Sequence, residues 1–141
     1  KMIEYNVRMG DPETEVVMPL IKSDLLELFI GVTTETLDRK KLEIDDRAAV
    51  TVVMVSGGYP GSYEKGKEIL GLENVTDSIL FHAGTRMLDN KVVTDGGRVL
   101  AVTSYGYNLE EALERSYCTI TRICFDQCAF RGDIGFDLRK G

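Results

Sequence analysis

The sequence predicts an α+β fold, with two short helices near the start, then a region of mainly antiparallel sheet and one packed helix. Three observations support this prediction. Residues 13–30 carry helix-start signals and apolar side chains at helical spacing. Residues 48–105 contain runs of β-branched side chains separated by short turns rich in Gly, Asp and Asn. Residues 108–124 return to the spacing of an amphipathic helix.

A charged segment that is poor in apolar residues, 39–46, separates the first helices from the sheet region. Such a segment has little to bury and suits a connection between folded parts. We therefore predict two domains, at residues 1–46 and 47–141.

The first eight residues alternate between apolar and polar side chains, which predicts a strand over Lys1–Arg8. Its polar face would carry Glu4, Asn6 and Arg8. Carboxylate and amide oxygens are ligands that Mg²⁺ prefers, and an arginine beside them could hold a phosphate or carboxylate. An ordinary half-solvated strand would show the same alternation, so both interpretations stay open.

Two helices are expected after this strand. Asp11 suits an N-cap, followed by a proline at the first helical position, and predicts a helix over 13–21. Ser23 and Asp24 can cap a second helix with an apolar stripe over Leu25–Ile30. Gly31 is a possible break, and residues 34–37 are expected to add a further helical turn.

Four strands are predicted in the second domain. The first is a run of small and β-branched residues expected to be buried on both faces. The other three are expected to form antiparallel neighbours joined by tight turns. Their predicted ranges are Ala48–Val55, Ser78–Met87, Lys91–Thr94 and Arg98–Tyr105.

The last predicted helix begins at Asn108, with Glu111 completing a capping box. Its apolar stripe is expected to pack against the sheet and to carry no chemistry. The stripe comprises Leu109, Ala112, Leu113, Tyr117, Ile120 and Cys124. Arg131 and Asp133, in the tail that follows this helix, are interpreted as structural.

The loop Ser56–Tyr63 contains three glycines, which allow a ligand or another part of the chain to approach the backbone closely. A structural turn and a substrate-facing loop are both consistent with it. The spacing from Gly61 to Gly66-Lys67 also fits the start of a phosphate-binding P-loop. Glu68 stands where Ser or Thr should meet Mg²⁺, and no strand leads directly into the loop, so we reject that interpretation.

Composition excludes several classes of protein. Apolar residues make up 43% of the 141-residue chain and charged residues 28%, as in soluble globular domains. No apolar run is long enough for a transmembrane helix, and polar residues interrupt any signal-peptide core near the start. The net charge is −6, and residues 1–46 hold 11 acidic and 6 basic side chains, a net charge of −5. We therefore expect no membrane or nucleic-acid partner.

Three cysteines are present, Cys118, Cys124 and Cys128, at spacings unlike those of a zinc site. Reduced thiols of a cytoplasmic protein are the expected state.

Four motifs together resemble the ATP-grasp superfamily and, within it, the phosphoribosylamine–glycine ligase family (glycinamide ribonucleotide synthetases). They are the strand and turn over residues 4–17, Ser-Gly-Gly-Tyr-Pro-Gly at 56–61, His-Ala-Gly-Thr at 82–85 and Gly-Gly-Arg at 96–98. The family usually has Leu or Phe at Met9 and Lys at Arg86. The resemblance covers nearly the whole chain, and it implies that residues 130–135 form the family's closing strand.

The resemblance implies that residues 1–46 end an ATP-grasp domain and residues 47–141 form the ligase's C-terminal domain. It implies an enzyme that joins glycine to 5-phosphoribosylamine with ATP, giving glycinamide ribonucleotide, ADP and phosphate in purine synthesis. Glu4 and Asn6 would bind Mg²⁺ or Mn²⁺ at the ATP phosphates. Arg8 would stabilise the glycyl phosphate, and Asp11 would face the substrate amine.

The resemblance also implies that Thr85, Arg86 and Arg98 hold the ribose 5′-phosphate of the substrate. Cations on the ends of surface hairpins are the alternative. His82, the single histidine, has a structural and a catalytic interpretation, and its role stays open.

Two alternatives to this function remain. One is a different ATP-grasp carboxylate–amine ligase, and the other is a module without catalytic activity. Because the chain starts without Met, inside a predicted strand, we interpret it as a C-terminal portion. We expect this portion to be inactive alone and to self-associate through its first 45 residues.

Overall fold

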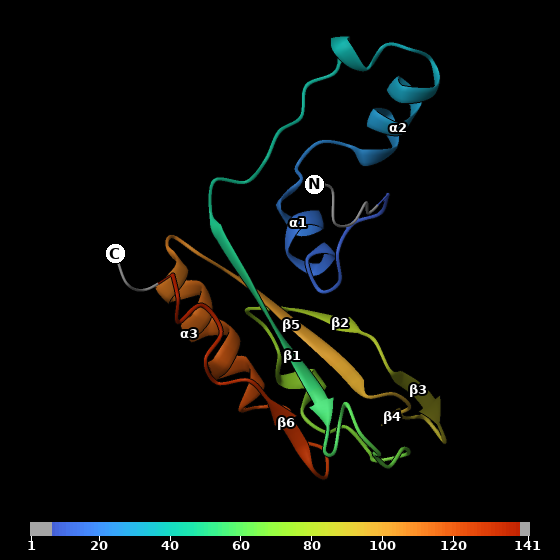
Figure 1. The fold of residues 1–141 in the computed structure, drawn as a ribbon, viewed down its shortest axis with the longest axis vertical. Coiled ribbons are helices and arrows are strands. Elements are labelled where there is room, and N and C mark those ends of the chain that lie inside the picture. Colours follow the sequence, from blue (N-terminus) through green and yellow to red (C-terminus); the bar gives the residue numbers. More distant parts are fainter. Residues whose placement is uncertain (1–6, 139–141) are drawn as a thin grey trace, which may run out of the picture. The chain divides into compact units, whose positions relative to one another are not determined.

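The computed structural model describes residues 7–138, and the chain divides into two compact units after Arg47 (Figure 1). Most of the strand predicted over Lys1–Arg8, with Glu4 and Asn6, lies outside the described residues. None of the described helices is long and apolar enough to cross a membrane.

The first helix of the first unit, α1, spans Thr14–Leu20 and begins later than predicted. Its N-cap is Glu13, so the prediction that Asp11 caps the helix is wrong. The reason is a turn ahead of the helix, in which the backbone N–H and the hydroxyl of Thr14 both donate to the carbonyl of Gly10.

The second helix, α2, spans Leu25–Thr33, and Asp24 accepts from two backbone N–H groups of its first turn, which confirms the predicted cap. The helix continues through Gly31, so the predicted break is wrong. Gly31 is buried, and a Cβ there would lie 3.4 Å from the Cα of Leu37. The further helical turn is a 3₁₀ turn, η1, over Leu37–Arg39 and not over 34–37.

The second unit contains an antiparallel four-stranded sheet in the order β2-β5-β1-β6. The strands β1 and β5 are long and central, and lie side by side in Figure 1. Their bounds are Ala48–Ser56 for β1, Ile79–His82 for β2, Arg98–Gly106 for β5 and Cys128–Phe130 for β6. The α+β class with a mainly antiparallel sheet is therefore confirmed.

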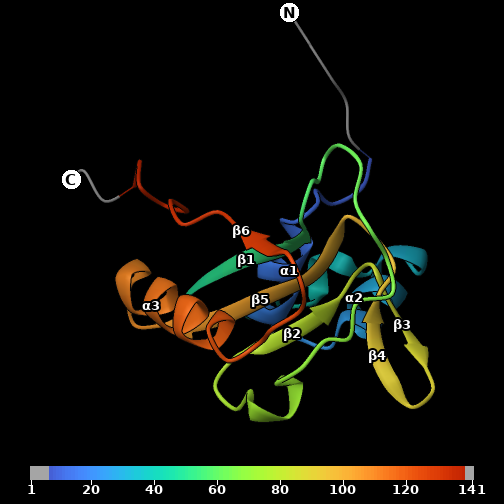
Figure 2. The same ribbon diagram turned by 90° about the horizontal axis from the view of Figure 1, so that it is seen from below.

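A separate hairpin pairs β3, Thr85–Leu88, with β4, Lys91–Thr94. The single strand predicted over 78–87 is thus wrong, because β2 and β3 belong to different sheets. Gly84 lies at the break, where its N–H donates to Arg98 in one direction and its carbonyl accepts from Asp95 in the other. Figures 1 and 2 both show the hairpin on the opposite side of this unit from helix α3.

Helix α3 spans Leu109–Ile120 and packs on β1 and β5. Asn108 caps it as predicted, but the Glu111 carboxylate accepts from the N–H of Tyr107 and not from that of the cap. Cys124 lies beyond the end of the helix and is exposed, so its place in the predicted stripe is wrong.

The core lies between α3 and the sheet, with further residues from the 69–75 and 123–125 segments. Leu113 and Ile120 of the helix meet the buried faces of β1 and β5, as the predicted stripe requires. Ser116, buried in the same face, donates to the carbonyl of Val50 over 3.2 Å. The short 3₁₀ turn η2 covers Leu72–Asn74.

The closing strand is β6 and ends at Phe130, so the prediction of a strand over 130–135 is wrong beyond its first residue. The chain then turns, and the N–H of Ile134 donates to the hydroxyl of Tyr117. Arg131 and Asp133 form a two-point ion pair within that turn, with both contacts at 2.8 Å.

Candidate functional site

Three glycine-containing loops meet at one end of the four-stranded sheet. Because β5 runs antiparallel to both β1 and β2, the ends of those two strands lie beside the start of β5. The loop after β1, the β2–β3 connection and the β4–β5 connection therefore come together. They carry three of the four sequence motifs, at 56–61, 82–85 and 96–98.

Ser56, at the end of β1, fastens the first loop to the third. Its backbone N–H donates to the carbonyl of Gly97 over 2.8 Å, and its buried hydroxyl donates to the carbonyl of Gly96 over 2.9 Å. The rings of Tyr59 and Tyr63 then lie against Gly97, where a side chain would meet both. The glycine at this position allows the two loops to pack directly.

The second and third loops approach each other backbone to backbone at Gly84 and Gly96. A Cβ on Gly84 would lie 2.5 Å from the Cα of Gly96 and 2.6 Å from the carbonyl oxygen of Arg98. Atoms do not approach so closely, and both neighbours are backbone atoms, so a side chain at Gly84 would force the loops apart. Glycine is therefore required here by contact distance, not by backbone torsion.

The three residues predicted to hold a substrate phosphate all lie in this loop cluster. The hydroxyl of Thr85 lies 2.9 Å from Nδ1 of His82, and Nε of Arg86 lies 3.8 Å from a carboxylate oxygen of Asp95. Arg98 is exposed at the start of β5, directly after the paired glycines. His82 is exposed as well, and its ring forms its hydrogen bond with the Thr85 hydroxyl.

The remaining predicted site residues belong to the first unit. Arg8 is exposed and donates to the carbonyl of Met9 over 2.9 Å. Asp11 lies, exposed, in the turn before α1. Glu4 and Asn6, the predicted metal ligands, lie outside the described residues. Within residues 7–138, no group of three or more His, Cys, Asp or Glu side chains could hold a metal ion.

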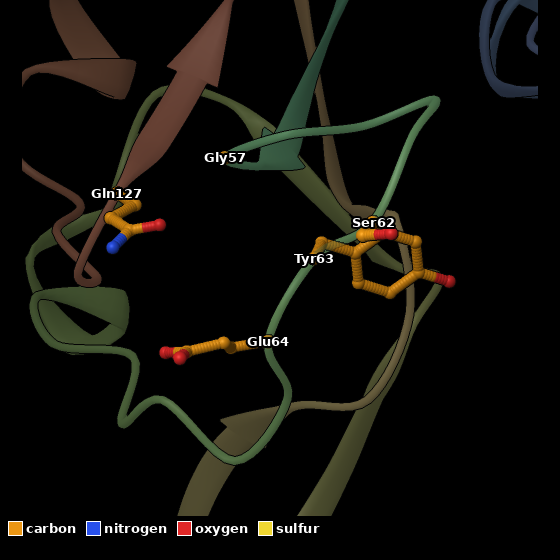
Figure 3. Close-up of a pocket in the computed structure, with 5 residues that line it drawn as sticks. All are labelled: Gly57, Ser62, Tyr63, Glu64 and Gln127. Atoms are coloured by element: carbon orange, nitrogen blue, oxygen red, sulfur yellow. The ribbon is translucent and has the colours of Figure 1, made fainter.

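A small open pocket of about 230 Å³ lies beside the loop cluster, as Figure 3 shows. Gly57 and Gln127 form one side, and Ser62, Tyr63 and Glu64 come from the end of the first loop. Sequence reasoning missed Gln127, which is 70 positions from Gly57 and reaches it because β6 pairs with the end of β1.

Lys67 fixes the segment that lines this pocket. Its Nζ lies 2.7 Å from Glu64 and 2.8 Å from Asp126. These two carboxylates raise the pKa of the Lys67 ammonium above its usual value. Residues 66–69 run in extended form beside β4, so no helix follows Gly66 as a P-loop would require.

Sequence reasoning also missed Lys65, whose Nζ lies 3.4 Å from the same Asp95 oxygen that faces Arg86. The sequence signal for Lys65 was its position between Gly61 and Gly66 in the rejected P-loop pattern. Lys65 and Asp95 are thirty positions apart, and only the pairing of the 66–69 segment with β4 brings them together.

These features define a small α+β domain whose sheet gathers glycine loops, hydroxyl groups and cations at one end. Residues 49–137 match the family described as phosphoribosylglycinamide synthetase, C domain, and the chain belongs to this family.

Relatives and a solved structure extend the match over nearly the whole chain. Phosphoribosylamine–glycine ligase of Escherichia coli K12 is 49% identical over 139 residues, which cover 96% of this chain and 32% of that protein. The ligase of Caldanaerobacter subterraneus is 45% identical, with 95% and 32% covered. The crystal structure of the Thermotoga maritima ligase aligns with a TM-score of 0.74 at 38% identity, covering 94% of this chain and 32% of that one. The chain thus spans about a third of the length of these relatives, and the predicted family resemblance is confirmed.

Proposed function

We propose that this chain is the C-terminal portion of an ATP-dependent ligase. The ligase would join glycine to 5-phosphoribosylamine through a glycyl phosphate, giving glycinamide ribonucleotide, ADP and phosphate. The name carried by relatives that match 95–96% of the chain supports this activity. A carboxylate must be activated by phosphoryl transfer before an amine can displace it, and ATP would supply that phosphoryl group.

The observation that carries the proposal is the convergence of Thr85, Arg86 and Arg98 at one loop cluster. A substrate phosphate requires cations and hydroxyl donors together, with backbone that a ligand can approach closely. We assign these three residues to the ribose 5′-phosphate. The proposed ligation needs no protein nucleophile, because the ATP phosphoryl group activates the glycine carboxylate.

The metal and catalytic roles rest on the sequence. Glu4 and Asn6 offer the oxygen ligands that Mg²⁺ or Mn²⁺ takes when it bridges nucleotide phosphates. A bound metal would neutralise charge on the transferring phosphoryl group. Arg8 would hold the acyl phosphate by its planar guanidinium, and Asp11 would receive the substrate amine.

The metal assignment is tested in the full-length enzyme by Glu4→Gln and Asn6→Ala. Either change should abolish ligation while the melting temperature stays nearly unchanged, because both side chains are expected on the polar face of the predicted strand. A loss of several kcal/mol in transition-state stabilisation is expected. Activity within about threefold of the wild type would contradict the assignment.

The phosphate assignment is tested by Arg98→Ala in the same enzyme. Use of phosphoribosylamine should weaken by about 1.5–3 kcal/mol, the range for a hydrogen bond to a charged group. The KM values for ATP and glycine should hardly change. A rise in KM for ATP alone would place Arg98 at the nucleotide site.

A different ATP-grasp carboxylate–amine ligase, or a module without activity, remains the alternative. Assay of the full-length protein with glycine and with other carboxylates separates the first. ATP binding and ligation by the full-length protein separate the second alternative. A ligase should show both, although this chain alone should show neither, whereas a module without activity should show neither in either form.

A further inference from the structure

Lys65 and Arg86 lie on opposite flanks of one strand, β4. Residues 66–69 pair with β4 on one side, and β3 pairs with it on the other. Asp95 directly follows the last residue of β4. The three side chains therefore come from separate stretches of sequence and meet at the end of a small three-stranded arrangement.

Backbone hydrogen bonds fix the Lys65 flank. The N–H of Gly66 donates to the carbonyl of Thr94 over 2.7 Å, and the N–H of Thr94 donates to Lys67 over 2.8 Å. Lys65 is thereby the next residue outward beside Asp95. The double ion pair of Lys67 with Glu64 and Asp126 holds the same segment from its other side.

The strand register fixes the Arg86 flank. Thr85 pairs with Thr94, and the N–H of Asp95 donates to the carbonyl of Gly84 over 2.7 Å. Asp95 therefore lies opposite Gly84, and Arg86, two residues further along β3, is on the same face. A diagonal neighbour at this spacing is within reach of a long side chain.

The contacts of Asp95 with its two cations are loose. They measure 3.4 Å to Lys65 and 3.8 Å to Arg86, and both end at the same carboxylate oxygen. The nearby pair of Lys91 and Glu68 measures 2.8 Å. All three side chains are 42–55% exposed, so a ligand from solvent can reach them.

Two cations and one carboxylate leave this group with a positive net charge, and one oxygen cannot engage all the donors of a guanidinium and an ammonium. A phosphate monoester has three oxygens and up to two negative charges, so it matches both donors better than one carboxylate does. The hydroxyl of Thr85 lies beside the same strand pair.

We propose that Lys65 and Arg86 together form a two-cation site for the phosphate monoester of the substrate, with Asp95 pairing both cations when no ligand is bound. The proposal rests on the proposed function for the identity of the phosphate, and adds Lys65 and Asp95 to the residues that decide its binding.

The test is titration of the 141-residue chain with ribose 5-phosphate, followed by calorimetry, with ribose and ATP as comparison ligands. Ribose 5-phosphate should bind saturably at about 1 mM, the affinity that a few charge-assisted contacts support. Ribose should not bind, because it lacks the phosphate. Absence of saturable binding, or equal binding of ATP, would overturn the proposal.

Lys65→Ala should weaken the binding of ribose 5-phosphate by about tenfold or more, the loss of one charge-assisted hydrogen bond. Lys65→Arg should restore most of it. Lys91→Ala is the matched control, because it removes the same charge from an exposed lysine of β4 that pairs with Glu68 and not with Asp95. It should change the binding by less than about twofold. Equal losses from Lys65→Ala and Lys91→Ala would show a general charge effect and refute the site.

Asp95→Asn should change the affinity for ribose 5-phosphate in the opposite direction to Lys65→Ala. It keeps the backbone hydrogen bond to Gly84 and removes the competing carboxylate, so ribose 5-phosphate should bind more tightly. Weaker binding would show that Asp95 does not compete with the ligand, which contradicts its proposed role. An inactive full-length ligase would refute the proposed function but leave these binding results unchanged.

Discussion

The two units of this chain differ in how far they bury their apolar side chains. The buried hydrophobic residues recorded in the structure all lie in the second unit, from Val50 to Phe125. Within residues 7–47, Gly31 is the one buried residue. Large apolar side chains of that unit stay exposed instead, among them Val7, Leu26, Phe29, Val32, Leu42 and Ile44.

The reason for the difference lies in the architecture of each unit. The second unit stacks a helix on a sheet, and each layer covers the apolar face of the other. The first unit has helices of seven and nine residues, too short to be stable without packing. Residues of α2 and η1 line an open apolar groove of about 460 Å³, whose walls include Leu25, Phe29 and Leu37. Regular secondary structure alone therefore does not make a self-sufficient domain.

The largest expected effect of this difference is on association. We predict that the 141-residue chain self-associates, most simply by edge pairing or strand exchange through its first 45 residues. A chain that starts at Arg47 should be monomeric and folded, because the second unit keeps its own core. Light scattering on both chains measures this. A monomeric long chain, or equal association of the two, would contradict the prediction.

Two alanine substitutions, one in each unit, test the difference in side-chain burial between the units. Leu100→Ala removes a fully buried side chain from the middle of β5 and should cost about 2–5 kcal/mol of unfolding free energy. Phe29→Ala removes a larger side chain that is 59% exposed and should change it by about 0.5 kcal/mol or less. Urea denaturation followed by far-ultraviolet circular dichroism reports the helices and strands of both units. Similar losses from the two variants would show that the first unit also contributes a core.

The smallest expected effect is a pH dependence confined to the second unit. Burial, and to a lesser extent Cys124, raises the pKa of the Cys128 thiol from 9.0 to about 11. Between these values the unfolded chain has lost the thiol proton and the folded chain has kept it. The unfolding free energy should therefore fall as pH rises through this window. The pKa of Lys67 is also raised, so this group also lowers the unfolding free energy as pH rises, at the alkaline end of the window.

Cys128→Ala should flatten this decline, and the exposed Cys118 supplies the control through Cys118→Ala. Denaturation midpoints measured at intervals from pH 8 to pH 11 compare the variants. An unchanged slope in Cys128→Ala would remove the thiol as a cause. An equally flattened slope in Cys118→Ala would show that burial is not the reason.

Elements whose signals are local can be predicted from the amino-acid sequence alone. The strand predicted over Ala48–Val55, the Asp24 and Asn108 caps, and the stripe of α3 apart from Cys124 are all present. Caps and periodicity involve residues within a few positions of each other, so neither depends on what the element later packs against. The glycine motifs likewise identified the loops of the candidate site and the family to which the chain belongs.

The points where elements divide, and the distant residues that meet, depend on tertiary contacts. Gly84 inside the β-rich run from Ser78 to Met87 is consistent with a bulge, but it does not by itself indicate that the chain changes sheet there. That break follows from hydrogen bonds to Arg98 and Asp95, in parts of the chain that come later. Lys65 reaches Asp95, and Gln127 reaches Gly57, only through pairings over thirty and seventy positions. Such contacts depend on strand register across the whole unit, which local propensity does not encode.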